Sequence, residues 1–96
     1  MIRFPNAKIN LGLRIVARRP DGYHNIETVF YPIQLQDALE IVPTSQQETG
    51  LSLSGIVIDG DPQNNLVMKA WQRLSHRFSL PPISIYLHKA IPFGAG

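Results

Sequence analysis

Lys8 and Asn10 lie in a segment whose residues alternate between apolar and polar, so both side chains fall on one face of a predicted strand. Their spacing along such a strand is about 7 Å. A fixed ammonium beside an amide suits an anionic or hydroxyl-bearing ligand, and it could stabilise charge that develops during phosphoryl transfer. The alternative is a solvated polar face, which is common on strands covered on one side only.

A second group with chemical potential is the turn Asp21-Gly22-Tyr23-His24. A phenol, an imidazole and the backbone amides of such a loop could sandwich a heteroaromatic base and form hydrogen bonds with it. Phe30 follows in the next predicted strand, in register with His24. The alternative is a hairpin tip whose aromatic side chains cover the edge of the core.

The last residues contain a glycine-rich strand exit. If the final strand keeps its alternation, Lys89 falls on the inward face with the apolar residues before it, where a charge needs a partner or an anion. The alternative is a strand that ends earlier and leaves Lys89 exposed. Glycines in the loop that follows let backbone amides approach phosphates, although an ordinary turn explains such a pair equally well, and a Walker A motif is absent. This loop comprises Pro92, Phe93, Gly94, Ala95 and Gly96.

The elements that must position these residues are strands and one helix. Strands are predicted over residues 7–16, 25–33, 39–42 and 83–87, and residues 51–58 give one or two more, broken at Gly55. The first two should form an antiparallel hairpin around the Asp-Gly turn. The first should be half-buried, with one apolar face made of Ala7, Ile9, Leu11, Leu13 and Ile15.

The helix is predicted to start after Asn64, whose side chain can accept from the free amides of the first turn, and to end before Pro81-Pro82. Its apolar stripe is expected to pack in the core and comprises Leu66, Val67, Ala70, Trp71, Leu74 and Phe78. Strands, then a helix, then a strand indicate an α+β fold with mostly antiparallel strands.

Length and composition allow one domain at most, because the chain has 96 residues, of which 44% are hydrophobic and 17% charged. The net charge of +2, with no long basic run, disfavours a general nucleic-acid binder. The absence of cysteine excludes disulfides and thiolate metal sites. No metal site is predicted from the histidines. No apolar stretch approaches the roughly 20 residues of a membrane span, so no membrane partner is expected. No nucleic-acid partner is expected either, because of the low net charge. A cytoplasmic location is expected.

Taken together, these segments resemble the 4-diphosphocytidyl-2-C-methyl-D-erythritol kinase family of the GHMP kinase superfamily. The opening segment at residues 5–11 resembles the family's Pro-Ala-Lys-Ile-Asn-Leu signature, and residues 19–24 resemble its most characteristic motif. Related kinases share the strand and the glycine loop but not the Asp-Gly-Tyr-His turn. The resemblance covers essentially the whole chain and implies the N-terminal part of a GHMP kinase domain, with a fold like domain 2 of a ribosomal protein.

The resemblance implies transfer of the γ-phosphoryl of ATP, with Mg²⁺, to a hydroxyl of 4-diphosphocytidyl-2-C-methyl-D-erythritol in the non-mevalonate isoprenoid pathway. It implies that Lys8 is the catalytic lysine and Asn10 a substrate-binding amide. Tyr23 and Phe30 would pack on the cytosine, and His24 would form a hydrogen bond with it. The residues implied on the ATP side are Asn65, Leu66, Lys89, Pro92, Phe93, Gly94, Ala95 and Gly96.

Residues 1–96 are expected to be a partial domain that ends inside the phosphate loop, because the family's loop continues with Leu-Gly-Gly-Gly-Ser-Ser. Asn6 replaces the family's usual small residue, which is a minor departure. The full-length parent is expected to be the enzyme, whereas this fragment alone should be inactive and could self-associate through uncovered surfaces. The alternative function is a free-standing β-rich binding or self-assembly module without catalysis.

Overall fold

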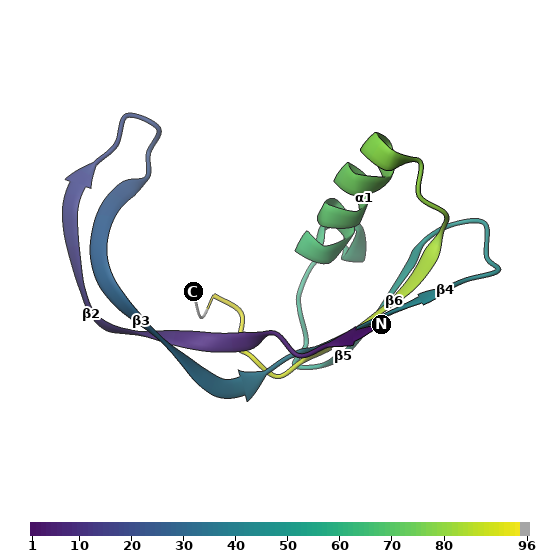
Figure 1. The fold of residues 1–96 in the computed structure, drawn as a ribbon, viewed down its shortest axis with the longest axis horizontal. Coiled ribbons are helices and arrows are strands. Elements are labelled where there is room, and N and C mark those ends of the chain that lie inside the picture. Colours follow the sequence, from purple (N-terminus) through teal and green to yellow (C-terminus); the bar gives the residue numbers. More distant parts are fainter. Residues whose placement is uncertain (95–96) are drawn as a thin grey trace.

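Two separate sheets and a helix make up the structure, a computed structural model that describes residues 1–94 (Figure 1). A four-stranded sheet has the order β1-β4-β6-β5, and a two-stranded sheet pairs β2 with β3. The predicted α+β class, with mostly antiparallel strands, is confirmed. The elements are β1 (Ile2–Arg3), β2 (Asn6–Arg18), β3 (His24–Gln36), β4 (Ala38–Pro43), β5 (Gly50–Gly55), a 3₁₀ turn (Pro62–Asn64), α1 (Leu66–Phe78) and β6 (Ile83–Lys89).

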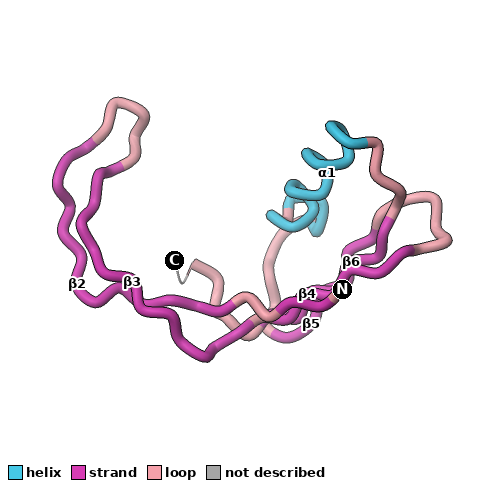
Figure 2. The backbone as a smooth tube through the Cα atoms, viewed as in Figure 1, coloured by secondary structure: helices cyan, strands magenta, loops and turns pink. Residues whose placement is uncertain are grey.

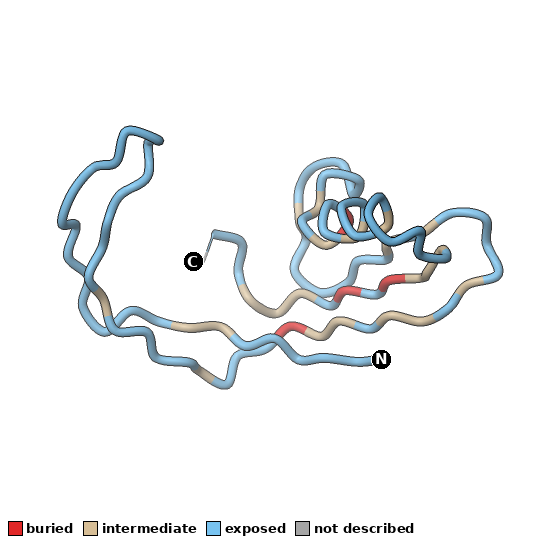
Figure 3. The backbone as a smooth tube through the Cα atoms, turned by 45° about the horizontal axis from the view of Figure 1, so that its top comes forward, coloured by how far each residue is buried: buried red, intermediate tan, exposed pale blue. Residues whose placement is uncertain are grey.

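The small core lies between α1 and the four-stranded sheet, in which β6 pairs antiparallel with β4 and parallel with β5. Ile85 and Leu87 of β6 are buried, whereas Tyr86 between them is about half exposed, so the helix covers one face of the sheet only. Met68 is the buried residue of α1 (Figure 3). The core is therefore thin, and it is confined to one end of the molecule.

The helix begins one residue later than predicted. The N-cap is Asn65, whose side-chain oxygen accepts from the amide of Val67 at 2.9 Å, while Asn64 ends the preceding 3₁₀ turn. The apolar stripe is only partly buried, since Leu66, Leu74 and Phe78 are 79%, 51% and 58% exposed. The expectation that the whole stripe packs in the core is wrong for these three and for Ala70, which is also exposed. Within residues 1–94, no helix has both the length and the apolar character needed to cross a membrane.

The β2–β3 hairpin extends away from the sheet as a long curved ribbon (Figures 1 and 2). Its existence was predicted, and each strand has 13 residues. The predicted half-burial of its first strand is wrong, because every residue of β2 beyond Lys8 is exposed. The ribbon's own cross-strand hydrogen bonds therefore hold its shape, with little support from a core.

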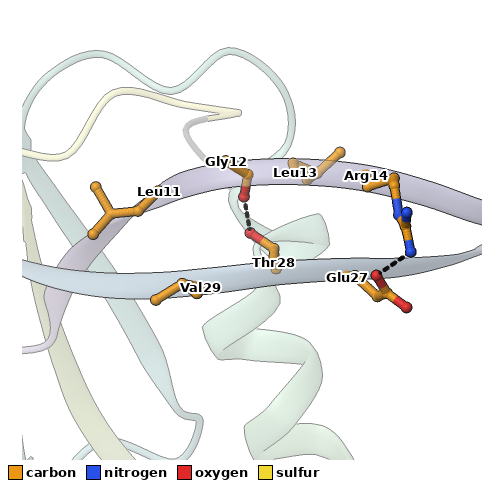
Figure 4. A pocket seen from close by; sticks show the side chains of 7 residues that line it. All are labelled: Leu11, Gly12, Leu13, Arg14, Glu27, Thr28 and Val29. Atoms are coloured by element: carbon orange, nitrogen blue, oxygen red, sulfur yellow. Dashed lines mark hydrogen bonds and ion pairs between the residues drawn. The ribbon is translucent and has the colours of Figure 1, made fainter.

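A β-bulge interrupts the ribbon where β2 places two residues, Leu11 and Gly12, opposite the single residue Val29 of β3. Gly12 has φ +79°, a conformation that glycine adopts without steric cost. The hydroxyl of Thr28 donates to the Gly12 carbonyl at 2.6 Å, so a carbonyl beside the irregular pairing is satisfied (Figure 4).

The bulge changes which side chains share a face. Asn10 pairs with Phe30 and Leu13 pairs with Thr28, and the two partners lie on one face of β3 because they are two residues apart. Leu13 therefore lies on the face of Asn10. The predicted single apolar face running from residue 7 to residue 15 is wrong beyond Leu11, because alternation in sequence carries no sign of an inserted residue.

The molecule is far more open than a compact protein of its size. Its accessible surface is 7683 Å², whereas a compact monomer of 10.8 kDa exposes about 5,500 Å². The radius of gyration is 16.5 Å, against about 13 Å for a compact domain of this length. Much apolar surface on the ribbon and on α1 therefore remains in contact with water.

A tight backbone approach fixes the end of β5 against β6. Gly55 has φ +82°, and a Cβ at this position would lie 2.2 Å from the carbonyl oxygen of Lys89. The next amide, that of Ile56, donates to the same carbonyl at 2.8 Å. The strand ends here, so residues 56–58 do not form the further strand that their composition suggested.

Gly55→Ala in the full-length parent should lower the free energy of unfolding by about 3 kcal/mol, because the new methyl collides with backbone and also strains a positive φ. Gly22→Ala is the matched control, since Gly22 has φ +87° with no atom within 4 Å of an added Cβ. It should cost about 1 kcal/mol. Urea unfolding followed by circular dichroism measures both values. Equal losses would show that the contact with Lys89 is not tight.

Candidate active site

Three of the sequence-predicted residues meet on one face of the ribbon. Asn10 lies directly opposite Phe30, and Lys8 occupies the next position on that face, opposite Pro32. The Lys8 ammonium lies over the Phe30 ring, 4.7 Å from its centroid. Because each member is held by paired backbone, the cluster is positioned by secondary structure rather than by a loop.

Lys8 carries a charge that the described residues do not neutralise, since it forms no ion pair within residues 1–94. A cation–π contact at an accessible site contributes only about 0.5–1 kcal/mol. The ammonium therefore remains able to attract an anion. The amide of Asn10 nearby can both donate to and accept from a hydroxyl group.

The tip of the ribbon is an ordered turn built around Asp21. One oxygen of its carboxylate accepts from Arg19 at 2.7 Å, and the other accepts from the amide of Tyr23 at 3.1 Å. The Arg19 amide donates to the Tyr23 carbonyl at 2.7 Å. The Tyr23 side chain is 73% exposed. Aspartate thus orders the turn that presents the phenol to solvent.

The structure places the predicted base-binding residues at two different points of the ribbon. His24 pairs with Arg18 at the tip end, on the register face that also carries Lys8 and Phe30. Phe30 is six residues farther along β3, about 20 Å in an extended strand. Phe30 is therefore grouped with Lys8 rather than with Tyr23.

A shallow depression lies on the ribbon at the bulge, between the two groups (Figure 4). Arg14 forms an exposed ion pair with Glu27 at its rim, at 2.6 Å. The depression is lined by Leu11, Gly12, Leu13, Arg14, Glu27, Thr28 and Val29.

On the predicted ATP side, the start of α1 presents one polar and one apolar residue. The side-chain oxygen of Asn65 is already used to cap the helix. Leu66, the first helical residue, is largely exposed and offers an apolar surface to a ligand. These two residues could therefore contact a flat apolar ring through Leu66 and through backbone groups.

Lys89 lies in β6 on the inward face, as continued alternation predicted, and its partner is Asp37. The Lys89 ammonium donates to Oδ2 of Asp37, while Oδ1 accepts from the amides of Ala90 at 2.8 Å and Ile91 at 2.9 Å. We call these four residues the Asp37 clasp. The sequence did not identify Asp37, although an inward lysine indicates that a partner or an anion lies nearby.

The pKa of Asp37 reflects two opposing effects. Burial favours the neutral acid and raises the pKa. The hydrogen bonds from Lys89 and from the amides of Ile91 and Ala90, together with the charge of Lys89, outweigh it and bring the pKa below the ordinary value. Asp37 is therefore ionised at neutral pH.

The glycine-rich exit follows the clasp directly. Phe93 is 85% exposed, and Gly94 has φ +74°. Ala95 and Gly96, also predicted to bind ATP, lie outside the described residues. In two views the described chain ends between the ribbon and α1 (Figures 1 and 3). The end of the described exit therefore lies between the ribbon that carries Lys8 and the helix.

Among the described residues, no group of three or more His, Asp or Glu side chains is placed to hold a metal ion.

Comparison with known proteins confirms the resemblance seen in the motifs. No family model matches the chain. A protein of Bacteroides fragilis named 4-diphosphocytidyl-2-C-methyl-D-erythritol kinase is 61% identical over 98 residues, which cover 100% of this chain and 36% of the relative. A protein of the same name from Parabacteroides distasonis is 58% identical over 96 residues, covering 100% of this chain and 35% of the relative.

A solved structure gives the same result. The crystal structure of a 4-(cytidine 5'-diphospho)-2C-methyl-D-erythritol kinase matches with a TM-score of 0.70 and 35% identity, covering 98% of this chain and 33% of that one. The chain spans about a third of the length of the relatives that it matches.

The lowered pKa of Asp37 predicts an acid-sensitive fold. A carboxylate with a depressed folded-state pKa stabilises the fold above its unfolded pKa, near 3.8, and loses this contribution as the pH falls through the folded pKa. The free energy of unfolding of the full-length parent should therefore fall between about pH 5 and about pH 2. Urea unfolding at several pH values measures this dependence.

The same series with Asp37→Asn should show a shallower fall, because the amide does not titrate. Glu48→Gln is the control, since Glu48 is exposed and lies in the turn before β5. It should keep the wild-type dependence. An Asp37→Asn curve parallel to that of the wild type would mean that Asp37 does not contribute to acid sensitivity.

Proposed function

We propose that this chain forms the N-terminal part of a 4-diphosphocytidyl-2-C-methyl-D-erythritol kinase, which transfers the γ-phosphoryl of ATP to a substrate hydroxyl. The names of relatives that are 57–61% identical along the whole chain support this activity. The observation that carries the proposal is the ribbon face on which Lys8, with no ion-pair partner among the described residues, lies beside Asn10 and Phe30.

In this proposal, Lys8 and Asn10 hold the acceptor hydroxyl. As the hydroxyl oxygen attacks the γ-phosphorus and the bond to the leaving ADP oxygen breaks, negative charge is spread over the transferred group and the two flanking oxygens. An ammonium already in position stabilises that charge without rearranging. The hydroxyl proton passes to a general base, to which we assign no residue of this chain.

The ribbon also suits the shape of the substrate, which has a methylerythritol at one end and a cytosine at the other. Lys8 and Asn10 are near the root of the ribbon, and Tyr23 and His24 are at its tip. An elongated molecule lying along one face can reach both groups. Tyr23 then stacks on the cytosine, His24 forms a hydrogen bond with it, and Phe30 packs nearer the reacting end.

On the other side of the site, we propose that ATP lies against Leu66 and the exit after β6. Pro92 has no N–H to offer, so its part is to direct the chain. The first loop residues that can donate backbone amides to a phosphate are Phe93 and Gly94, and Ala95 and Gly96 would continue the cradle. The Mg²⁺ expected with ATP is not assigned to residues of this chain.

A cytoplasmic location also remains part of the proposal.

The alternative is a free-standing binding or self-assembly module, and the open structure argues against the binding module that exists as a monomer. A self-contained module would cover its apolar surface, whereas this chain exposes far more surface than a compact protein of its mass. We therefore place residues 1–96 in a partial domain and assign the activity to a protein of the relatives' length. The 96-residue chain alone should show no ADP production with the cytidine substrate, ATP and Mg²⁺.

Lys8→Ala in the full-length protein should lower kcat by at least about 100-fold and change the KM of either substrate less than about threefold. An interaction made mainly in the transition state appears in kcat, and loss of one electrostatic donor typically costs about 100-fold or more. ADP release with the cytidine substrate measures both constants. Lys69→Ala on the exposed side of α1 is the control and should behave as wild type. An unchanged kcat with a raised KM would limit Lys8 to binding.

Tyr23→Ala should raise the KM for the cytidine substrate about five- to 150-fold and leave the KM for ATP nearly unchanged. The lost stacking face contributes about 1–3 kcal/mol. Tyr31→Ala is the matched control, because Tyr31 is a similarly exposed tyrosine that pairs with Ile9 on the opposite register face. Equal effects of the two substitutions would show that the tyrosines act through ribbon stability.

The isolated chain should self-associate, because its uncovered apolar surfaces and unpaired strand edges can pack against a second copy. Sedimentation equilibrium over a range of concentrations should give an average mass that rises above 10.8 kDa. A monomer mass at all concentrations, together with cooperative thermal unfolding, would show that the chain satisfies its own surfaces and would favour the module.

A further inference from the structure

Asp37 is the buried polar residue of the described chain, and the proposed kinase chemistry does not use it. It is only 7% exposed, and it lies where β3 passes into β4. Burying a carboxylate is costly unless its oxygens receive hydrogen bonds, so a residue of this kind signals a specific arrangement around it. Here the arrangement is the Asp37 clasp.

The two carboxylate oxygens of Asp37 accept hydrogen bonds from different donors. Oδ2 accepts from the Lys89 ammonium, and Oδ1 accepts from two consecutive backbone amides, those of Ala90 and Ile91. Two neighbouring amides that point at one oxygen fix the direction of the chain at that point. The chain therefore leaves β6 on a path set by Asp37, immediately before Pro92.

The same residue is attached to the root of the ribbon. The backbone amide of Asp37 donates to the carbonyl of Pro5 at 3.0 Å. The residue before it, Gln36, pairs with Asn6, the first residue of β2. Asp37 thus joins the strand that carries Lys8 to the exit that leads into the glycine-rich loop.

We infer that Asp37 is a positioning residue for ATP: through Oδ1 it holds the start of the phosphate loop in a fixed place relative to the Lys8 strand. This inference rests on the proposed function. Asp37 does not touch ATP itself. It fixes the amides of Ala90 and Ile91, and so determines where the next donors, at Phe93 and Gly94, meet the phosphates. Because reacting groups must meet within a narrow range of distances, such a link bears directly on transfer.

The test compares two double variants of the full-length protein that differ only in the Oδ1 acceptor. Asp37→Asn with Lys89→Met removes both charges and keeps an oxygen that can accept from the two amides. Asp37→Leu with Lys89→Met has nearly the same shape but no acceptor. Any direct role of Lys89 is removed equally from both, so it cancels in the comparison.

The dissociation constant for ATP, measured by calorimetry without the second substrate, should be at least about tenfold higher for the leucine variant than for the asparagine variant, because two hydrogen bonds are lost. The KM for the cytidine substrate should differ less than about threefold between the two. A purely structural role would instead change both substrates together. As a second variant, Asp37→Glu keeps the charge but displaces the carboxylate, and it should also weaken ATP binding about tenfold.

Equal dissociation constants for the two double variants would overturn the positioning role. If the leucine variant does not fold, Asp37→Glu with wild-type ATP affinity would overturn it as well. A wild-type protein that binds ATP but does not phosphorylate the cytidine substrate would overturn the proposed function and leave the ATP comparison valid. A wild-type protein that does not bind ATP would overturn both.

Discussion

A carboxylate that leaves water must be matched by donors, and Asp37 meets this requirement with the Lys89 ammonium and two backbone amides. Removing one partner of such a buried pair typically costs about 3–5 kcal/mol, because the other charge is left uncompensated. Few residues of this chain are buried, so the clasp is a large share of what holds it together. It also lies where the ribbon, the four-stranded sheet and the glycine-rich exit meet, so the relative placement of all three depends on it.

The ribbon shows how an exposed element can still hold side chains in a defined arrangement. Both of its faces are solvated, yet paired backbone hydrogen bonds hold Lys8 and Asn10 in register with Phe30. At the tip, Asp21 orders the turn through contacts to Arg19 and Tyr23. Such side chains remain accessible to a ligand, and in the ribbon hydrogen bonds supply the order that a core supplies elsewhere.

The sequence predicted those features that depend on neighbouring residues. Alternation located the strands, and the Asp-Gly turn located the hairpin. Continued alternation also placed Lys89 on the inward face, but its partner lies 52 residues away in sequence, and no local pattern indicates such a pairing. The bulge at Gly12 was missed because glycine interrupts an alternating pattern in the same way as any small residue. Burial was overestimated on Leu74 and Phe78, since an apolar stripe does not say whether the chain itself covers it.

The two lysines of the candidate site differ in what they can contribute electrostatically. Lys89 faces a buried carboxylate, so the pair carries little net charge, and its ammonium attracts a phosphate only weakly. Lys8 has an aromatic ring beside it and no ion pair within residues 1–94, so its charge is retained. In the proposed kinase, the charge needed for transfer therefore comes from Lys8, whereas Lys89 neutralises Asp37, whose other oxygen fixes the backbone path into the loop. Lys89 would attract a phosphate as strongly as Lys8 only if Asp37 were neutral, and the lowered pKa of Asp37 keeps this carboxylate ionised.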